Sequence, residues 1–121
     1  MADLTDIKNK FNSQKLFEAF KAQLKKDFEQ SNLSADFVET LMPDYNHIHE
    51  RIVIELQRNE MRTDFNVMRL LNRIDISEPQ LKRYLAENKD ERHFNVVAEL
   101  IIKRVLQKVV IKQLYKSKED L

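Results

Sequence analysis

The longest apolar pattern with helical spacing lies at residues 91–116, ERHFNVVAELIIKRVLQKVVIKQLYK. A helix of this length extends about 39 Å, whereas a compact domain of 121 residues is about 35 Å across. The middle of the segment is apolar around much of its circumference, which is more than the single stripe of a surface helix. The sequence therefore predicts one continuous helix that spans the domain and forms the centre of its core.

The stretch ISEPQL at residues 76–81 marks the start of the preceding helix. Ser77 and Gln80 have the spacing of a capping box, and the isoleucine and leucine at the two ends have the spacing of a hydrophobic staple. The proline falls in the first turn, where its missing N–H costs nothing. We therefore expect a helix that begins at Glu78 and ends near Asn88, with the asparagine in the left-handed backbone conformation.

Apolar residues elsewhere also recur at intervals of three and four, which predicts helices rather than strands. Ser34 and Asp44 are suitable N-caps, and Pro43 disfavours helical geometry in the residue before it. Further helices are expected at 13–30, 34–42, 45–61 and 64–73, with a frayed arm or short helix at 1–12. The predicted fold is all-α: a single domain over residues 1–121, in which a small bundle of five or six helices packs around a long C-terminal helix.

The chain contains no glycine and no cysteine, although average usage would put about eight glycines in a chain of this length. Glycine-rich phosphate loops, dinucleotide fingerprints and nucleophile elbows need glycine for positive φ or for a close backbone approach, so these motifs are excluded. The lack of cysteine excludes disulfides, thiolate nucleophiles and zinc sites with sulfur ligands. We therefore predict a protein that is not an enzyme and uses no cofactor.

Charge and hydropathy indicate a neutral protein of the cytoplasm. The chain has 21 Lys+Arg and 20 Asp+Glu, with a net charge of −3 over residues 1–60 and +4 over 61–121. This modest polarity argues against a dedicated polyanion binder. No run of aliphatic or aromatic residues exceeds three, far short of the ~18 of a membrane span and of the apolar core of a signal peptide. We expect a cytoplasmic location and no membrane partner.

The apolar circumference of the last helix points to a function in protein association. The other helices of so small a domain are short, and we expect them to leave one face of this helix uncovered. A second copy of the chain is the expected partner, because two-fold dimers are the commonest closed assembly. The leading prediction is thus a helical protein–protein interaction module that forms a homodimer. Its predicted interface residues are Ile102, Leu106, Val110, Ile111, Leu114 and Tyr115.

The alternative is a small DNA-binding regulator. Residues 67–85, VMRLLNRIDISEPQLKRYL, resemble the helix-turn-helix of transcription regulators, whose buried positions would be occupied by Leu70, Ile74, Ile76, Leu81 and Tyr84. Leu71 stands where a small residue is usual, and Asp75 stands in place of the turn glycine. The resemblance implies that the second helix enters the major groove, with Lys82 and Arg83 facing bases or phosphates.

A basic stretch runs along the C-terminal helix. From Leu100 to Lys118 there is no acidic residue, whereas six residues are Lys or Arg. Cations near a helix C-terminus complement the helix dipole, and a solvated basic face is the ordinary reason for such a run. Under the DNA-binding alternative, Arg104, Lys108 and Lys112 would add contacts to phosphates.

The three histidines offer only a weak metal motif. His47 and Glu50 are i, i+3 neighbours on a helix and could share a metal, but His49 points about 200° away from His47, so these two cannot chelate together. The third, His93, has only Asp90 and Glu91 close in sequence. We therefore predict no metal site and interpret the histidines as solvated or capping residues.

Overall fold

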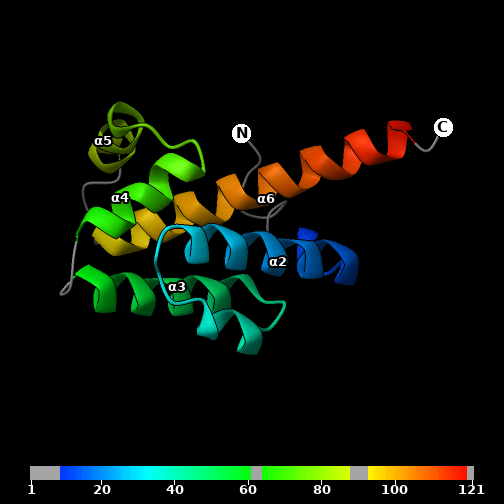
Figure 1. The fold of residues 1–121 in the computed structure, drawn as a ribbon, viewed down its shortest axis with the longest axis horizontal. Helices are drawn as coiled ribbons and strands as arrows, with labels where there is room; N and C mark the ends of the chain where they lie inside the picture. The colour runs from blue at the N-terminus through cyan, green and yellow to red at the C-terminus, as the bar shows by residue number, and fades with distance from the viewer. Residues whose placement is uncertain (1–8, 61–63, 88–92, 120–121) are drawn as a thin grey trace.

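The computed structural model describes residues 9–60, 64–87 and 93–119 of the chain. Within these ranges it contains α-helices, one short 3-10 helix and no strand. The elements in chain order are α2 (Gln14–Gln30), η1 (Asp36–Thr40), α3 (Tyr45–Glu60), α4 (Asp64–Arg73), α5 (Glu78–Glu87) and α6 (His93–Glu119) (Figure 1). The predicted all-α bundle around a long C-terminal helix is confirmed. Most of the predicted arm at 1–12, and the predicted cap Asn88, lie outside the described residues.

The last helix is one unbroken element, as its sequence pattern predicts. α6 has 27 residues and packs against α2, α3 and α5, so its apolar middle runs through the centre of the bundle (Figure 1). Ile101, Ile102 and Val105 are completely buried there, and full burial of one such side chain contributes about 1.5–3 kcal/mol. None of the helices in the described part of the chain has the length and apolarity to cross a membrane.

Two of the six predicted interface residues do not lie on an uncovered face of α6. Ile102 and Leu106, both predicted as interface residues, are 0% and 2% exposed within the single chain. The reason is that α2, α3 and α5 approach α6 from different sides, so each short helix has to cover only part of its circumference. These two residues therefore offer no surface to a partner, and the exposed large hydrophobic side chains of α6 in the described ranges lie in its last turns.

The helix starts carry the side-chain caps that the sequence predicts. Asp44 Oδ2 accepts a hydrogen bond from the backbone N–H of His47 at 3.1 Å and caps α3. Ser77 Oγ accepts from the backbone N–H of Gln80 at 3.2 Å, and Gln80 Oε1 accepts from that of Ser77 at 3.4 Å, which confirms the capping box. The start of α5 is thereby fixed only a few residues after the end of α4.

The segment predicted as a helix at 34–42 is a 3-10 helix over five residues instead. Ser34 Oγ accepts from the backbone N–H of Asp36 at 3.4 Å, and the following backbone is already extended at Leu41. So short a segment closes with i→i+3 bonds, which need fewer residues per turn than the α-helix. Its Phe37 ring packs edge-on against Phe28 of α2, with centroids 5.1 Å apart, so η1 covers the C-terminal end of α2.

Two helices end in a Schellman motif without glycine. Asn32 after α2 and Asp75 after α4 have φ of 61° and 65°. At the second site the N–H of Ile76 donates to the carbonyl of Leu71 at 2.8 Å and the N–H of Asp75 to that of Asn72 at 3.1 Å. Asn and Asp enter the left-handed region more readily than other residues with a Cβ, but they still carry the steric cost that glycine avoids.

We expect Asp75→Gly to be more stable than Asp75→Ala by about 0.5–1 kcal/mol. The left-handed conformation costs a Cβ-bearing residue roughly 1–2 kcal/mol, and the greater freedom of glycine in the unfolded chain offsets about 0.5–1 kcal/mol of that gain. Urea unfolding of both variants, followed by circular dichroism, measures the difference. Equal stability of the two variants would show that the backbone at this position relaxes out of the left-handed region.

Candidate interaction site on the last helix

The C-terminal turns of α6 carry three exposed large hydrophobic side chains, Ile111, Leu114 and Tyr115, which we call the apolar end patch. Their exposed fractions are 46%, 60% and 65%. The other exposed large hydrophobic residues in the described ranges are Met42, in a loop, and Ile54, on α3. The apolar end patch is thus the one place in the described structure where three such side chains gather on a single element.

The helical repeat brings the three side chains to one side of α6. Their positions fall within about 100° of the circumference, and Val110, at the border, is half-buried. Figure 1 shows that the C-terminal end of α6 extends past the ends of α2 and α3. Of the six predicted interface residues, the structure therefore leaves the apolar end patch accessible and Val110 accessible in part.

Just before the patch, one buried carboxylate holds three helices together. Asp27 of α2 is 0% exposed and accepts hydrogen bonds from Gln23 Nε2 at 3.0 Å, Arg73 Nε at 3.0 Å and Lys108 Nζ at 3.5 Å. Lys112 Nζ donates to Gln23 Oε1 at 2.6 Å. These five residues, the Asp27 cluster, connect α2, α4 and α6 through charge-assisted bonds, which are stronger than neutral ones.

Lys108 and Lys112 form a row of basic residues along α6, and Arg104 continues this row by one turn toward the N-terminus of the helix. Its Nε donates to the backbone carbonyl of Ile74 at 3.3 Å, and its Nη1 donates to Gln107 Oε1 at 2.6 Å. Its Nη2 lies 3.9 Å from Asp75 Oδ2. Arg104 therefore links α6 to the connection between α4 and α5.

The residues predicted to contact nucleic acid fall into two groups in the structure. Arg104 and Lys108 are half-buried and Lys112 is exposed, and all three donate hydrogen bonds within the chain. Lys82 and Arg83 are exposed on α5, where Lys82 Nζ pairs with Glu78 at 3.3 Å. The α6 group thus belongs to the packing of the bundle, whereas the α5 group lies on an open helix face.

A short connection joins α4 to α5. Residues 74–77 connect the two helices, and Asp75 adopts the left-handed conformation that glycine usually supplies there. In Figure 1, α4 runs across the view while α5 is seen almost end-on, so the two helices are steeply inclined to each other. Leu71 is buried despite its size, so the larger side chain does not prevent this arrangement.

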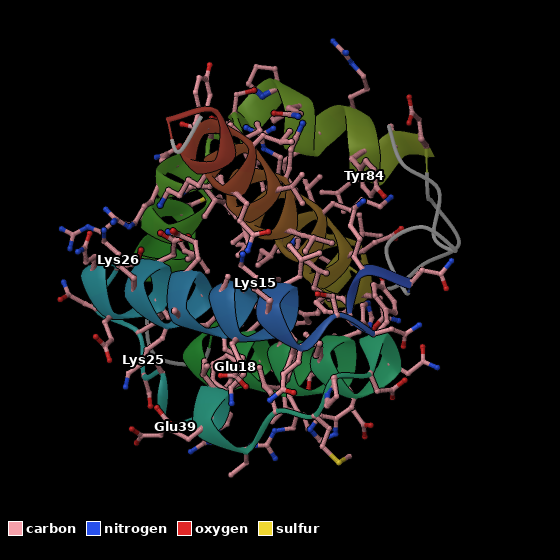
Figure 2. All side chains as sticks on the ribbon, turned by 90° about the vertical axis from the view of Figure 1, so that its right-hand side faces the viewer. Lys15, Glu18, Lys25, Lys26, Glu39 and Tyr84 are labelled. Atoms are coloured by element: carbon pink, nitrogen blue, oxygen red, sulfur yellow. The ribbon has the colours of Figure 1, made fainter. Side chains whose placement is uncertain are left out.

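A second polar cluster, which no sequence motif predicted, joins α5 and α3 to α6. Lys103 Nζ donates to Tyr84 Oη at 2.9 Å and pairs with Glu99 at 2.9 Å. Figure 2 places Tyr84 between α5 and α6. Tyr45 of α3 is buried close to these groups, and its burial, reinforced by the negative charge of Glu99, raises the pKa of its hydroxyl. The cluster draws on three helices, and no spacing along the sequence could have assembled it.

His49 takes a structural position on α3. His49 Nε2 lies 3.0 Å from the backbone oxygen of Asn95, and its ring stacks on Tyr45 with centroids 5.8 Å apart. His49 therefore links α3 to the first turn of α6. Within the described ranges there is no group of three or more His, Cys, Asp or Glu side chains that could hold a metal ion.

Comparisons with known proteins identify no relative of this chain. No family model, no curated protein and no solved structure matches the chain. Any functional conclusion therefore has to come from the surfaces described above.

We expect the stability of the protein to fall as the pH rises above about 10, the ordinary pKa range of tyrosine and lysine. Burial raises the pKa of Tyr45. For Lys103, burial lowers the pKa, but the bonds to Tyr84 and Glu99 outweigh it and leave the pKa raised. Both groups hold their protons more tightly in the folded state, so their contribution is complete below the unfolded pKa and is lost above it. Urea unfolding at a series of alkaline pH values measures the slope.

Tyr45→Phe removes one of the two titrating groups and is expected to make this slope shallower. Tyr115→Phe is the matched control, because it removes the same hydroxyl from an exposed position. Identical slopes in the wild type and in Tyr45→Phe would contradict the role of Tyr45.

Proposed function

We propose that this protein is a non-enzymatic protein–protein interaction module that self-associates through the apolar end patch of α6. The observation that carries the proposal is the gathering of Ile111, Leu114 and Tyr115, each close to half exposed or more, on the end of the longest helix. When a partner covers such exposed apolar side chains, the free energy falls by roughly 25 cal/mol per Å² of apolar surface removed from water.

A second copy of the chain fits this patch because a two-fold axis through it would place apolar side chains against apolar side chains. Two nearby cations do not oppose such contact. Lys108 turns toward Asp27 and Lys112 toward Gln23, which directs both ammonium groups to α2. Three side chains bury much less than the ~800 Å² per partner of a standard interface, so the expected dimer is weak and concentration-dependent.

The internal polar groups support a non-catalytic function. The carboxylate of Asp27 is bonded to cations of two other helices, and Lys103 is bonded to Tyr84 and Glu99. A general acid or base has to reach a substrate within hydrogen-bond distance. These groups instead contact one another between helices, where their bonds hold the bundle together.

The test is the double substitution Ile111→Ser and Leu114→Ser, compared with wild type by light scattering from micromolar to millimolar concentration. We expect the apparent mass of wild type to rise toward a dimer, and the dissociation constant of the double variant to increase by tenfold or more, about 1.4 kcal/mol. Met42→Ser is the control, because Met42 is comparably exposed, at 54%, but lies outside α6. A strictly monomeric wild type over this range, or equal weakening in the control, would overturn the proposal.

A second candidate, duplex DNA binding through α4 and α5, is favoured by two observations. Asp75 adopts the left-handed turn conformation of the helix-turn-helix, and Lys82 and Arg83 are exposed on the helix that would enter the major groove. The exposed face of that helix also carries Glu78 and Glu87, which lowers the expected affinity. We therefore rank this candidate behind self-association.

Fluorescence anisotropy with a labelled duplex over a range of salt concentrations tests the second candidate. Lys82→Ala with Arg83→Ala is expected to weaken binding and to reduce the slope of log K against log salt by about 2, because each phosphate contact contributes close to one. Lys25→Ala is the control, since Lys25 pairs with Glu39 on the η1 side of α2 (Figure 2). Absence of binding at low salt, or an unchanged slope in the double variant, would eliminate DNA binding by α5.

A further inference from the structure

We propose that the Asp27 cluster, together with Arg104, is a binding site for a linear oligophosphate group. Arg104, Lys108 and Lys112 follow one another at intervals of four residues along α6, which spaces them by about 6 Å along the helix axis. All three reach toward the same flank, because their partners lie on α2 and in the connection after α4. Arg73 of α4 joins the row across Asp27.

Positive charge exceeds negative charge in this row. Arg73, Arg104, Lys108 and Lys112 supply four cations, and the carboxylates paired with them are Asp27 and Asp75. Asp75 is the weaker partner, at 3.9 Å from Arg104, and its side chain is 73% exposed. Two positive charges are therefore left without a carboxylate inside the row, which favours an anion of at least two charges.

The buried carboxylate lies behind the cations and does not face an incoming anion. Asp27 is 0% exposed, whereas the side chains of Arg73 and Lys108 are 32% and 23% exposed. The cations are thus positioned between Asp27 and solvent. Asp27 holds their side chains in place before any ligand arrives, which reduces the conformational entropy that binding would cost.

Donor groups remain for a ligand. Arg73 contacts Asp27 through Nε, and no described residue accepts a hydrogen bond from its two Nη atoms. The ammonium groups of Lys108 and Lys112 each donate one bond of the three they can form. A guanidinium fork matches two oxygens of a phosphate, and a lysine adds a point charge. A row of such donors matches phosphates joined in a chain better than one isolated phosphate.

Isothermal titration of the full-length protein with sodium tripolyphosphate, at constant ionic strength, tests this proposal. We expect saturable one-to-one binding to wild type, and binding at least tenfold weaker for orthophosphate. Lys112→Gln and Lys108→Gln are each expected to weaken tripolyphosphate binding about tenfold, the equivalent of one charge-assisted hydrogen bond. Lys25→Gln removes the same charge from the other side of α2 and is expected to leave the affinity unchanged.

Asp27→Asn separates binding from stability. This variant removes a negative charge from beneath the row, while its amide oxygen can still accept a hydrogen bond and hold Arg73 in place, so we expect lower thermal stability together with equal or tighter tripolyphosphate binding. Weaker tripolyphosphate binding in Asp27→Asn than in wild type would contradict a site that depends on excess positive charge. Because Lys112 is exposed, Lys112→Gln is expected to fold normally by circular dichroism, and it keeps the test valid even if Lys108→Gln unfolds.

Competition with duplex DNA identifies the source of the phosphates. One outcome is that DNA displaces tripolyphosphate in a way that Lys108→Gln and Lys112→Gln weaken and Lys82→Ala does not. This result would support the site and would identify the nucleic-acid backbone as its ligand. Failure of DNA to compete would support a small oligophosphate. No saturable binding of tripolyphosphate to wild type, or equal affinities in Lys112→Gln and Lys25→Gln, would overturn the proposal. None of these outcomes depends on the dimer, because the apolar end patch is left unchanged.

Discussion

The apolar middle of α6 has to be shielded from water on all sides, and the positions of the other helices follow from this requirement. α2, α3 and α5 each bury an apolar stripe against it, and α4 is placed by its contacts with α2 and α3. Because no single short helix can cover a rod of 27 residues, the shielding is divided among them. Within the described residues, the exposed large hydrophobic side chains of α6 lie in its last turns, toward the end that extends past α2 and α3 (Figure 1).

Polar contacts then fix how the helices are arranged around this apolar centre. Asp27 connects α2 to Arg73 of α4 and to Lys108 of α6, and Lys103 connects α6 to Tyr84 of α5. Hydrophobic burial is not directional, whereas a hydrogen bond requires a defined distance and angle. These contacts therefore select one arrangement among several that would bury similar apolar area. They also concentrate positive charge along one flank of α6.

The two proposed activities use different parts of the same helix. Self-association would use the last turns, where apolar side chains are uncovered, and oligophosphate binding would use the preceding turns, where cations gather above a buried carboxylate. Both follow from the length of α6, since its last turns carry uncovered apolar side chains while the turns before them carry lysines that reach back to α2.

The sequence alone determined the helical class, the single long last helix and the capped starts at Asp44 and Ser77, because these depend on local spacing and local hydrogen bonds. It could not determine which face of α6 stays exposed: Ile102 and Ile111 are both apolar residues of one pattern, yet only the second is accessible. Only the tertiary structure decided this, and only it brought Asp27 to Lys108 across 81 positions. The physical reason is that coverage and long-range pairing depend on how separate helices pack together, which the periodicity within one helix does not specify.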